Sequence, residues 1–309
     1  MISGTVNNRI TSSAPRALIV DGHALAYRMY YALPEMISPS GEPTQAIFGF
    51  IKSLRRTVET LLPTHGAVVW DGGLSTMRLE LLPEYKGQRP PMPDAFRRQL
   101  TPLQNWVSLA GWPCLLEKGI EADDLIGVLA AEAEAAGAEV YIMSADKDFM
   151  QLVTDRVHLW RDKGGKVEVV TPQSVLEKTG VRPDQIVDWL SLIGDSSDNI
   201  AGVPGIGPRT AARLLNEFGS IYAMYENIER VKPVKIQLSL KEKRDLLLRN
   251  QKLIRLSLIP EYKGYWEKMK LASENKSEIV KFLNDFGLKS LLRLESQQQP
   301  PVMMQAELF

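Results

Sequence analysis

The stretch "ALIVDG" at residues 17–22 is a short apolar run that ends in aspartate and glycine. Such a run is typical of a buried strand that meets a loop. The pattern recurs in "HGAVVWDGG" (65–73) and "AEVYIMSADKD" (138–148), and "PCLLEKG" (113–119) fits another short strand. Helical patterns lie between these strands, at 23–33, 44–62, 96–112 and 121–137. Strands that alternate with helices predict an α/β fold with a mainly parallel sheet flanked by helices.

The second half of the chain has a different pattern of predicted strands and helices. "VHLWRD" and "KVEVVTP" predict a hairpin around Gly164-Gly165, and from about residue 180 short helices broken by glycine and proline replace the strands. We therefore expect an α/β core at 16–180, a helical region at 181–295, and flexible tails at 1–15 and 296–309. Within the core, residues 75–98 form a basic, proline-bearing segment that we call the arch segment. We expect it to be irregular from 75 to 93.

Composition sets limits on the function. The 309 residues carry 37 Lys and Arg against 37 Asp and Glu, so any electrostatic argument must be local. Cys114 is the only cysteine, which excludes an internal disulfide and a cysteine-rich zinc site and favours a reducing cytoplasm. No apolar run approaches the roughly 20 residues that span a bilayer.

Acidic residues gather at positions that the predicted fold brings to one edge. In an open parallel sheet, functional groups collect beyond the carboxyl ends of the strands. Each acid alone has an ordinary explanation as a turn, a helix cap or a solvated side chain. Nine carboxylates at one edge would repel one another unless cations lie between them. The nine are Asp21, Asp71, Glu121, Asp123, Asp124, Asp146, Asp148, Asp195 and Asp198.

These ligands indicate a particular chemistry. Hard carboxylate oxygens select Mg²⁺ or Mn²⁺ rather than zinc. Two such ions about 4 Å apart suit phosphodiester hydrolysis, in which they activate water and stabilise the attacking and leaving oxygens. No protein nucleophile is then needed, which fits the lack of a Ser-His or Cys-His arrangement in the sequence.

"GVPGIGPRTAARLL" at 202–215 predicts a helix-hairpin-helix that grips a phosphate backbone without reading bases. The alternative is an ordinary Gly-Pro helix junction. The basic stretch 230–255 is either a solvated helical face or a second contact to a duplex. The hairpin residues expected at the backbone are Gly202, Val203, Gly205, Ile206, Gly207, Arg209 and Thr210.

Basic and aromatic residues near the acids suggest further contacts. Arg78, Lys86 and Arg89 of the arch segment are candidates to meet a phosphate near the metals. Tyr27 is a candidate to stack on a base.

Taken together, these motifs resemble the 5′ nuclease family, which includes the 5′–3′ exonuclease domain of bacterial DNA polymerase I and its flap-endonuclease relatives. The resemblance covers residues 16–295. It rests on seven motifs in the family's order: "VDGHALAYR", "VVWDGG", "YKGQR", "GIEADDLIG", "SADKDFMQL", "GDSSDNIAGVPGIG" and "FLNDFGLKSLL".

The resemblance implies a PIN-like (resolvase-like) fold and Mg²⁺-dependent, structure-specific cleavage of branched or 5′-ended duplex DNA, RNA primer ends included. It assigns all nine acids to the metal cluster. It places Arg78, Lys86 and Arg89 in an arch at the scissile phosphate, and the hairpin 202–212 on duplex backbone, where the family often holds K⁺. Two rival functions are a non-catalytic DNA-junction-binding protein and a PIN-type ribonuclease.

The final "QAELF" resembles the short peptide by which bacterial replication proteins dock in the sliding clamp. Gln305 would donate or accept a hydrogen bond while Leu308 and Phe309 fill an apolar cleft. A chance ending is an equal alternative. We expect a free-standing, monomeric, cytoplasmic and nucleoid-associated nuclease, although a piece cut from a longer protein would look the same.

Overall fold

A six-stranded sheet forms the centre of the computed structural model, which describes residues 14–163, 166–257 and 259–297. The strand order is β3-β2-β1-β4-β5-β6, and every neighbouring pair is parallel except β5 with β6. The prediction of a mainly parallel sheet flanked by helices is confirmed. The strands are β1 (Arg16–Asp21), β2 (His65–Trp70), β3 (Cys114–Leu116), β4 (Glu139–Met143), β5 (Val157–Lys163) and β6 (Lys166–Val170).

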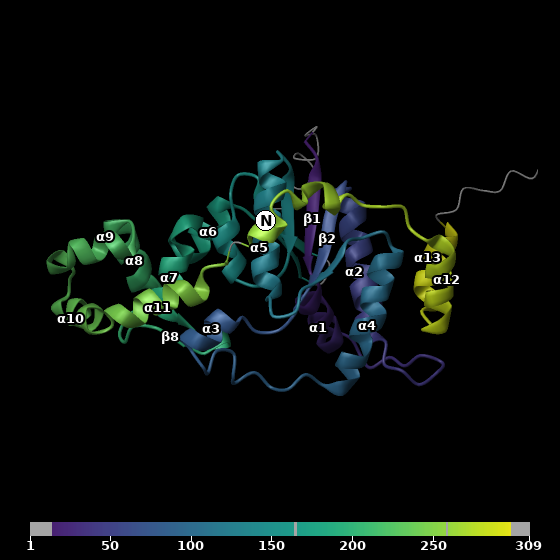
Figure 1. Cartoon of the computed structure of the whole chain (residues 1–309), viewed down its shortest axis with the longest axis horizontal. Coiled ribbons are helices and arrows are strands. Elements are labelled where there is room, and N and C mark those ends of the chain that lie inside the picture. The colour runs from purple at the N-terminus through teal and green to yellow at the C-terminus, as the bar shows by residue number, and fades with distance from the viewer. Residues whose placement is uncertain (1–13, 164–165, 258, 298–309) are drawn as a thin grey trace, which may run out of the picture.

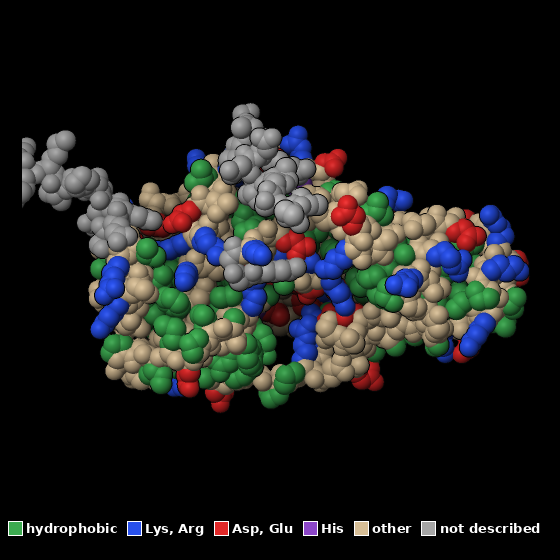
Figure 2. All heavy atoms as spheres, turned by 180° about the vertical axis from the view of Figure 1, so that it is seen from behind, with side chains coloured by type: hydrophobic (Ala, Val, Ile, Leu, Met, Phe, Trp, Pro, Cys, Tyr) green, Lys and Arg blue, Asp and Glu red, His purple; other side chains and the backbone are tan. Residues whose placement is uncertain are grey.

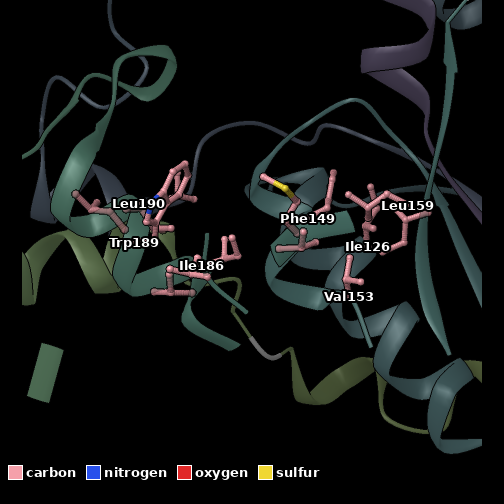
Figure 3. Close-up of a cluster of buried hydrophobic side chains, with 14 of the residues drawn as sticks. Ile126, Phe149, Val153, Leu159, Ile186, Trp189 and Leu190 are labelled. Atoms are coloured by element: carbon pink, nitrogen blue, oxygen red, sulfur yellow. The ribbon is translucent and has the colours of Figure 1, made fainter. Parts of the chain in front are cut away.

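Both faces of this sheet are covered, because alternate residues of each strand point to opposite sides. Along β1, Leu18 and Val20 enter one apolar core, whereas Ala17 and Ile19 enter the other. Figure 3 shows part of the second core. The covering helices of this half are α1 (Gly22–Ala32), α2 (Gln45–Leu61), α3 (Thr76–Leu81), α4 (Asp94–Leu109), α5 (Ala122–Ala135), η1 (Asp148–Leu152) and α6 (Pro172–Thr179).

The arch segment differs from its prediction. Residues 76–81 form the helix α3 rather than an irregular excursion, and Arg78 on this helix is buried. The predicted hairpin is present as β5 and β6, which pair antiparallel. Its turn at Gly164-Gly165 lies outside the described residues.

Helices predominate after residue 180, but the expectation that strands stop there is wrong. Gly194 pairs with Ala201 and Asp195 with Ile200 in a two-stranded antiparallel ladder. Each strand has only two residues, too few to show the alternation by which strands are predicted. The elements are η2 (Pro183–Gln185), α7 (Ile186–Ile193), β7 (Gly194–Asp195), η3 (Ser196–Asp198), β8 (Ile200–Ala201), α8 (Pro208–Phe218), α9 (Ile221–Glu226), η4 (Ile228–Arg230), α10 (Val234–Glu242) and α11 (Arg244–Ile254).

The chain then returns across the α/β core instead of continuing the helical region (Figure 1). The amide of Leu271 donates to the carbonyl of Thr64, and Ile279 and Phe282 pack in the core beside α4. These last elements are η5 (Pro260–Tyr262), η6 (Tyr265–Met269), α12 (Lys276–Asp285) and α13 (Lys289–Gln297). Among the described residues, no helix has the length and apolarity needed to cross a membrane.

Candidate metal centre and nucleic-acid interface

The fold carries the nine acids to the predicted edge of the sheet. Asp21 ends β1 and caps α1, where its Oδ1 accepts from the amide of Ala24 at 3.0 Å. Asp71 follows β2, Asp146 and Asp148 follow β4, and the remaining acids lie at the start of α5 and around β7. Because parallel strands end at one edge, residues distant in sequence meet there.

Three of these carboxylates form a compact group. Oxygens of Asp148, Asp195 and Asp198 lie within 4.8 Å of one another. Burial, reinforced by the charges of Asp146 and Asp195, raises the pKa of Asp148 to about 8. Its Oδ1 is buried and receives no hydrogen bond from the described residues. An unsatisfied carboxylate oxygen among like charges fits a divalent cation.

A second group surrounds Asp21. Burial, with added repulsion from Asp146 and Asp71, raises the pKa of Asp21 to about 6. Burial raises the pKa of Asp123 as well, and Asp146 and Asp21 are among the charges that add to the effect. The charges of Asp71 and Asp146 thus act on Asp21, and those of Asp146 and Asp21 act on Asp123.

Ser144 is a residue of this group that sequence reasoning missed. Its hydroxyl donates to Asp21 Oδ2 at 3.0 Å and accepts from the amide of Asp146 at 3.1 Å. The amide of Asp148 in turn donates to Asp146 Oδ1 at 2.9 Å. Ser144 therefore fixes the acid-bearing loop after β4 relative to β1. Its position two residues before Asp146 was the only available signal.

Lys86 lies inside the acidic cluster. Its Nζ is 2.5 Å from Glu121, 3.8 Å from Asp123 and 3.9 Å from Asp198, and the side chain is buried. Burial opposes its charge, but the neighbouring carboxylates outweigh that effect and raise the pKa of Lys86. Arg89 Nη2 is 2.8 Å from Asp198 Oδ1. Lys86 and Arg89 of the arch segment thus pair with the acids, and their contact with a phosphate stays a prediction.

Tyr85 is a second residue that sequence reasoning missed. Its hydroxyl lies 3.2 Å from Glu121 Oε2 and 3.1 Å from Asp198 Oδ2, so it bridges acids from the two halves of the chain. It directly precedes Lys86 in "YKGQR", which was the only signal in the sequence. Lys147 similarly pairs with Asp195 at 2.8 Å.

Arg78 and Asp124 do not lie where the resemblance placed them. Both oxygens of Asp124 accept from Arg78, at 2.6 and 2.7 Å, and Arg78 is 2% exposed. A guanidinium buried in this way is not presented to a nucleic acid. Both Asp124 oxygens accept from Arg78, which also donates to Glu121, and Asp124 Oδ1 accepts from the amide of Ser257 as well.

Tyr27 lies on the outer side of α1 and is 39% exposed. Its ring contacts those of Tyr31 and Phe96, with centroids 4.8 and 5.3 Å away. Tyr27 lies six positions after Asp21, which corresponds to about 9 Å of helix. An exposed aromatic ring near the acids is compatible with base stacking.

The hairpin at 202–207 has the backbone features that a phosphate contact requires. Gly205 has φ +84°, and Gly207 precedes α8, which begins with Pro208. Val203 and Ile206 are buried and anchor the loop, and Gly202 packs against the backbone of Ile193 and Gly194. Of the predicted set, Gly205, Gly207 and Arg209 are exposed and Thr210 is half-buried. First-turn amides of a helix lack acceptors within the helix and suit an anion.

A cavity of about 460 Å³ lies beside the β7–β8 turn and this hairpin, and none of the nine acids is among its described lining residues. Gln88 and Lys147 line one part of it, and Asn199 and Gly207 line another. Figure 2 shows acidic side chains at the bottom of a hollow in this face, with Lys and Arg side chains beside them. The arrangement places a crowded group of carboxylates near a glycine-rich hairpin and exposed basic side chains.

The chain is similar to proteins of known description. The family "5′-3′ exonuclease, N-terminal resolvase-like domain" matches residues 16–180, and "5′-3′ exonuclease, C-terminal SAM fold" matches residues 181–277. DNA polymerase I of Bacillus caldotenax is 35% identical over 284 residues, which are 91% of this chain and 32% of that protein. The thermostable DNA polymerase I of Thermus aquaticus is 44% identical over 221 residues, 71% of this chain and 26% of that protein. The chain thus spans only about a quarter to a third of the length of these relatives.

Solved structures agree on the fold. T5 5′-exonuclease with bound divalent zinc superposes with a TM-score of 0.68 at 22% identity, covering 91% of this chain and 98% of that one. The catalytic core of Rad2 in complex with DNA superposes with a TM-score of 0.59 at 15% identity, covering 93% and 95%. Since the family descriptions together match most of the sequence, the chain belongs to the 5′-3′ exonuclease family.

Proposed function

We propose that this chain hydrolyses phosphodiester bonds at 5′ flaps, nicks and 5′ ends of duplex DNA, RNA primer ends included, during replication and repair. The observation that carries the proposal is the closeness of two features: Asp195 and Asp198 of the crowded carboxylate cluster lie at the β7–β8 turn, and the glycine-rich hairpin follows β8 directly. Relatives support it, because T5 flap endonuclease and the Rad2 core have both been solved in complex with DNA.

The site is proposed to hold two or more Mg²⁺ or Mn²⁺ ions. Asp148, Asp195 and Asp198 would hold one ion, because their oxygens already converge and one of them lacks a donor. Asp21 and Asp123 would contribute to the other, together with neighbouring acids. Bound divalent ions supply Lewis acidity and lower the pKa of water to a range in which hydroxide forms near neutral pH.

Side chains of the protein position the substrate around this centre. Lys86 is the cation best placed to turn from Glu121 and Asp198 to the scissile phosphate once divalent ions neutralise those acids. Arg89, about half exposed, would follow the same exchange. The hairpin around Gly205 would hold the duplex backbone, and its carbonyl oxygens would be ligands of a K⁺ ion.

The test is cleavage of a 5′-labelled double-flap DNA with and without Mg²⁺, beside the Asp146→Ala variant. We expect Mg²⁺-dependent release of the flap near the junction, and loss of cleavage with retained DNA binding in the variant. Tight junction binding without cleavage under any divalent metal would establish the non-catalytic function instead. A preference for single-stranded RNA would establish a PIN-type ribonuclease.

Partner and location remain proposals. Gln305, Leu308 and Phe309 of the clamp-binding peptide lie outside the described residues, so docking to a sliding clamp rests on the sequence alone. Binding of a synthetic "QAELF" peptide to a purified clamp tests it directly. A monomer in the cytoplasm, associated with the nucleoid, is the proposed working state.

A further inference from the structure

The guanidinium of Arg78 donates hydrogen bonds to two sets of acceptors, which lie in different parts of the fold. Towards the acids, Nη1 donates to Glu121 Oε1 at 2.9 Å and to Asp124 at 2.6 Å, and Nη2 donates to Asp124 at 2.7 Å. Towards the helical region, Nε donates to the carbonyl of Leu253 at 2.9 Å and Nη2 to that of Arg255 at 3.3 Å. All five N–H groups are occupied, so none remains for a phosphate.

The second direction leads to the end of α11. Its last carbonyls lack partners within the helix, and a buried cation suits that terminus. The amide of Ser257 donates to Asp124 Oδ1 at 2.7 Å, and Gln151 of η1 contacts both Ile254 and Leu256. The chain that leaves α11 is therefore held by three elements that carry or adjoin the acids.

Two residues in the last two turns of α11 also hold the segment that leads into the hairpin. Asn250, fully buried, donates to the carbonyls of Ser191 at 3.0 Å and Ala201 at 2.8 Å, and Ala201 directly precedes the hairpin. Gln251 donates to Asp188 of α7 at 2.6 Å. An unbroken series of buried contacts thus joins the hairpin, α11, Arg78 and Glu121.

We propose that Arg78 and Asp124 are positioning residues that fix Glu121 relative to the duplex-gripping hairpin. The pair acts as one unit: Arg78 orients Glu121 for the metals, and Asp124 holds Arg78 and the end of α11. The inference rests on the proposed function for its effect on cleavage, but its structural part does not depend on cleavage.

A double-mutant cycle tests it, with Arg78→Met, Asp124→Asn and the double variant. The matched control is the exposed pair Arg182 and Asp184, which contact at 2.9 Å, changed to Met and Asn in the same way. Each protein is titrated with Mn²⁺ alone, followed by paramagnetic resonance. Single-turnover cleavage of flap DNA and duplex binding in Ca²⁺ are then measured.

We expect each test variant to bind Mn²⁺ about 10- to 100-fold more weakly, as loss of a group that orients metal ligands does. The double variant should bind Mn²⁺ no more weakly than whichever single variant has the lower Mn²⁺ affinity, because the pair acts as a unit. The Kd for duplex should stay within about threefold of wild type, since the hairpin contacts are untouched. In Arg78→Met, the amides of Leu256 and Ser257 should exchange faster with deuterium. The control pair should match wild type.

Additive losses, or a loss of duplex affinity with unchanged Mn²⁺ binding, would overturn the inference and make Arg78 a DNA contact. If Arg78→Met does not fold, the same cycle is run with Arg78→Lys, which keeps the charge but cannot contact all partners. Wild-type protein that shows the coupling but cuts no DNA would overturn the proposed function and leave the inference intact.

Discussion

Magnesium binding should tighten steeply as the pH rises from 6 to 8, because the ion must displace protons from the acidic cluster. The pKa of Asp148 is about 8 and that of Asp21 about 6. The ionised fraction of a carboxyl group with a pKa of 8 rises from about 1% at pH 6 to about half at pH 8. From Asp148 alone, the apparent affinity for Mg²⁺ should therefore increase about fifty-fold across this window.

The stability of the metal-free protein should change in the opposite direction. A carboxyl group that titrates at 3.8 when unfolded and near 8 when folded binds more protons in the folded state between those values. Stability must then fall as the pH rises through this window, and saturating Mg²⁺ should restore it. Thermal unfolding at pH 6 and pH 8, with and without Mg²⁺, measures both effects.

Calorimetric titration with Mg²⁺ in two buffers of different ionisation enthalpy counts the protons released. We expect proton release at pH 6 to 7 in the wild type. Asp148→Asn should bind Mg²⁺ weakly and with a shallower dependence on pH, which separates this residue from Asp21. Equal affinities at pH 6 and pH 8, with no proton release, would refute the reasoning.

Three further outcomes follow from the site. Lys86→Ala should slow single-turnover flap cleavage by about 10²- to 10³-fold, as loss of a group that stabilises transition-state charge does, whereas duplex affinity should change much less. The control Lys289→Ala should behave as wild type, and equal losses of rate and affinity in Lys86→Ala would contradict the assigned role. Gly205→Ala should weaken duplex binding in a salt titration, because φ +84° strains any residue with a Cβ. The control Gly264→Ala carries a similar strain at φ +75° away from the hairpin, and equal losses of duplex affinity in the two variants would show that strain alone acts. Ser144→Ala should weaken Mn²⁺ binding by about tenfold or more through the two acids that it joins, measured by paramagnetic resonance, whereas unchanged affinity would make its hydrogen bonds incidental.

Local patterns in the sequence predicted the sheet and the place of the acids, because strand periodicity and the carboxyl ends of parallel strands are properties of short segments. The partner of Asp124 was not predictable in this way. Arg78 lies 46 residues away, and its burial depends on α3 and on the end of α11. The return of residues 259–297 to the α/β core was missed for the same reason, because the sequence of a helix does not by itself determine which part of the fold the helix packs against.

The lysine within the acidic cluster has a consequence for how the protein exists without metal. Many small metal-binding domains unfold when the ion is removed, because nothing else balances their ligands. Here Lys86 pairs with Glu121 and Arg89 with Asp198, and burial raises the pKa of Asp148 to about 8. Part of the acidic cluster is thus balanced by the protein's own basic side chains, and a divalent ion bound there would compete with Lys86 and Arg89 for the same carboxylates.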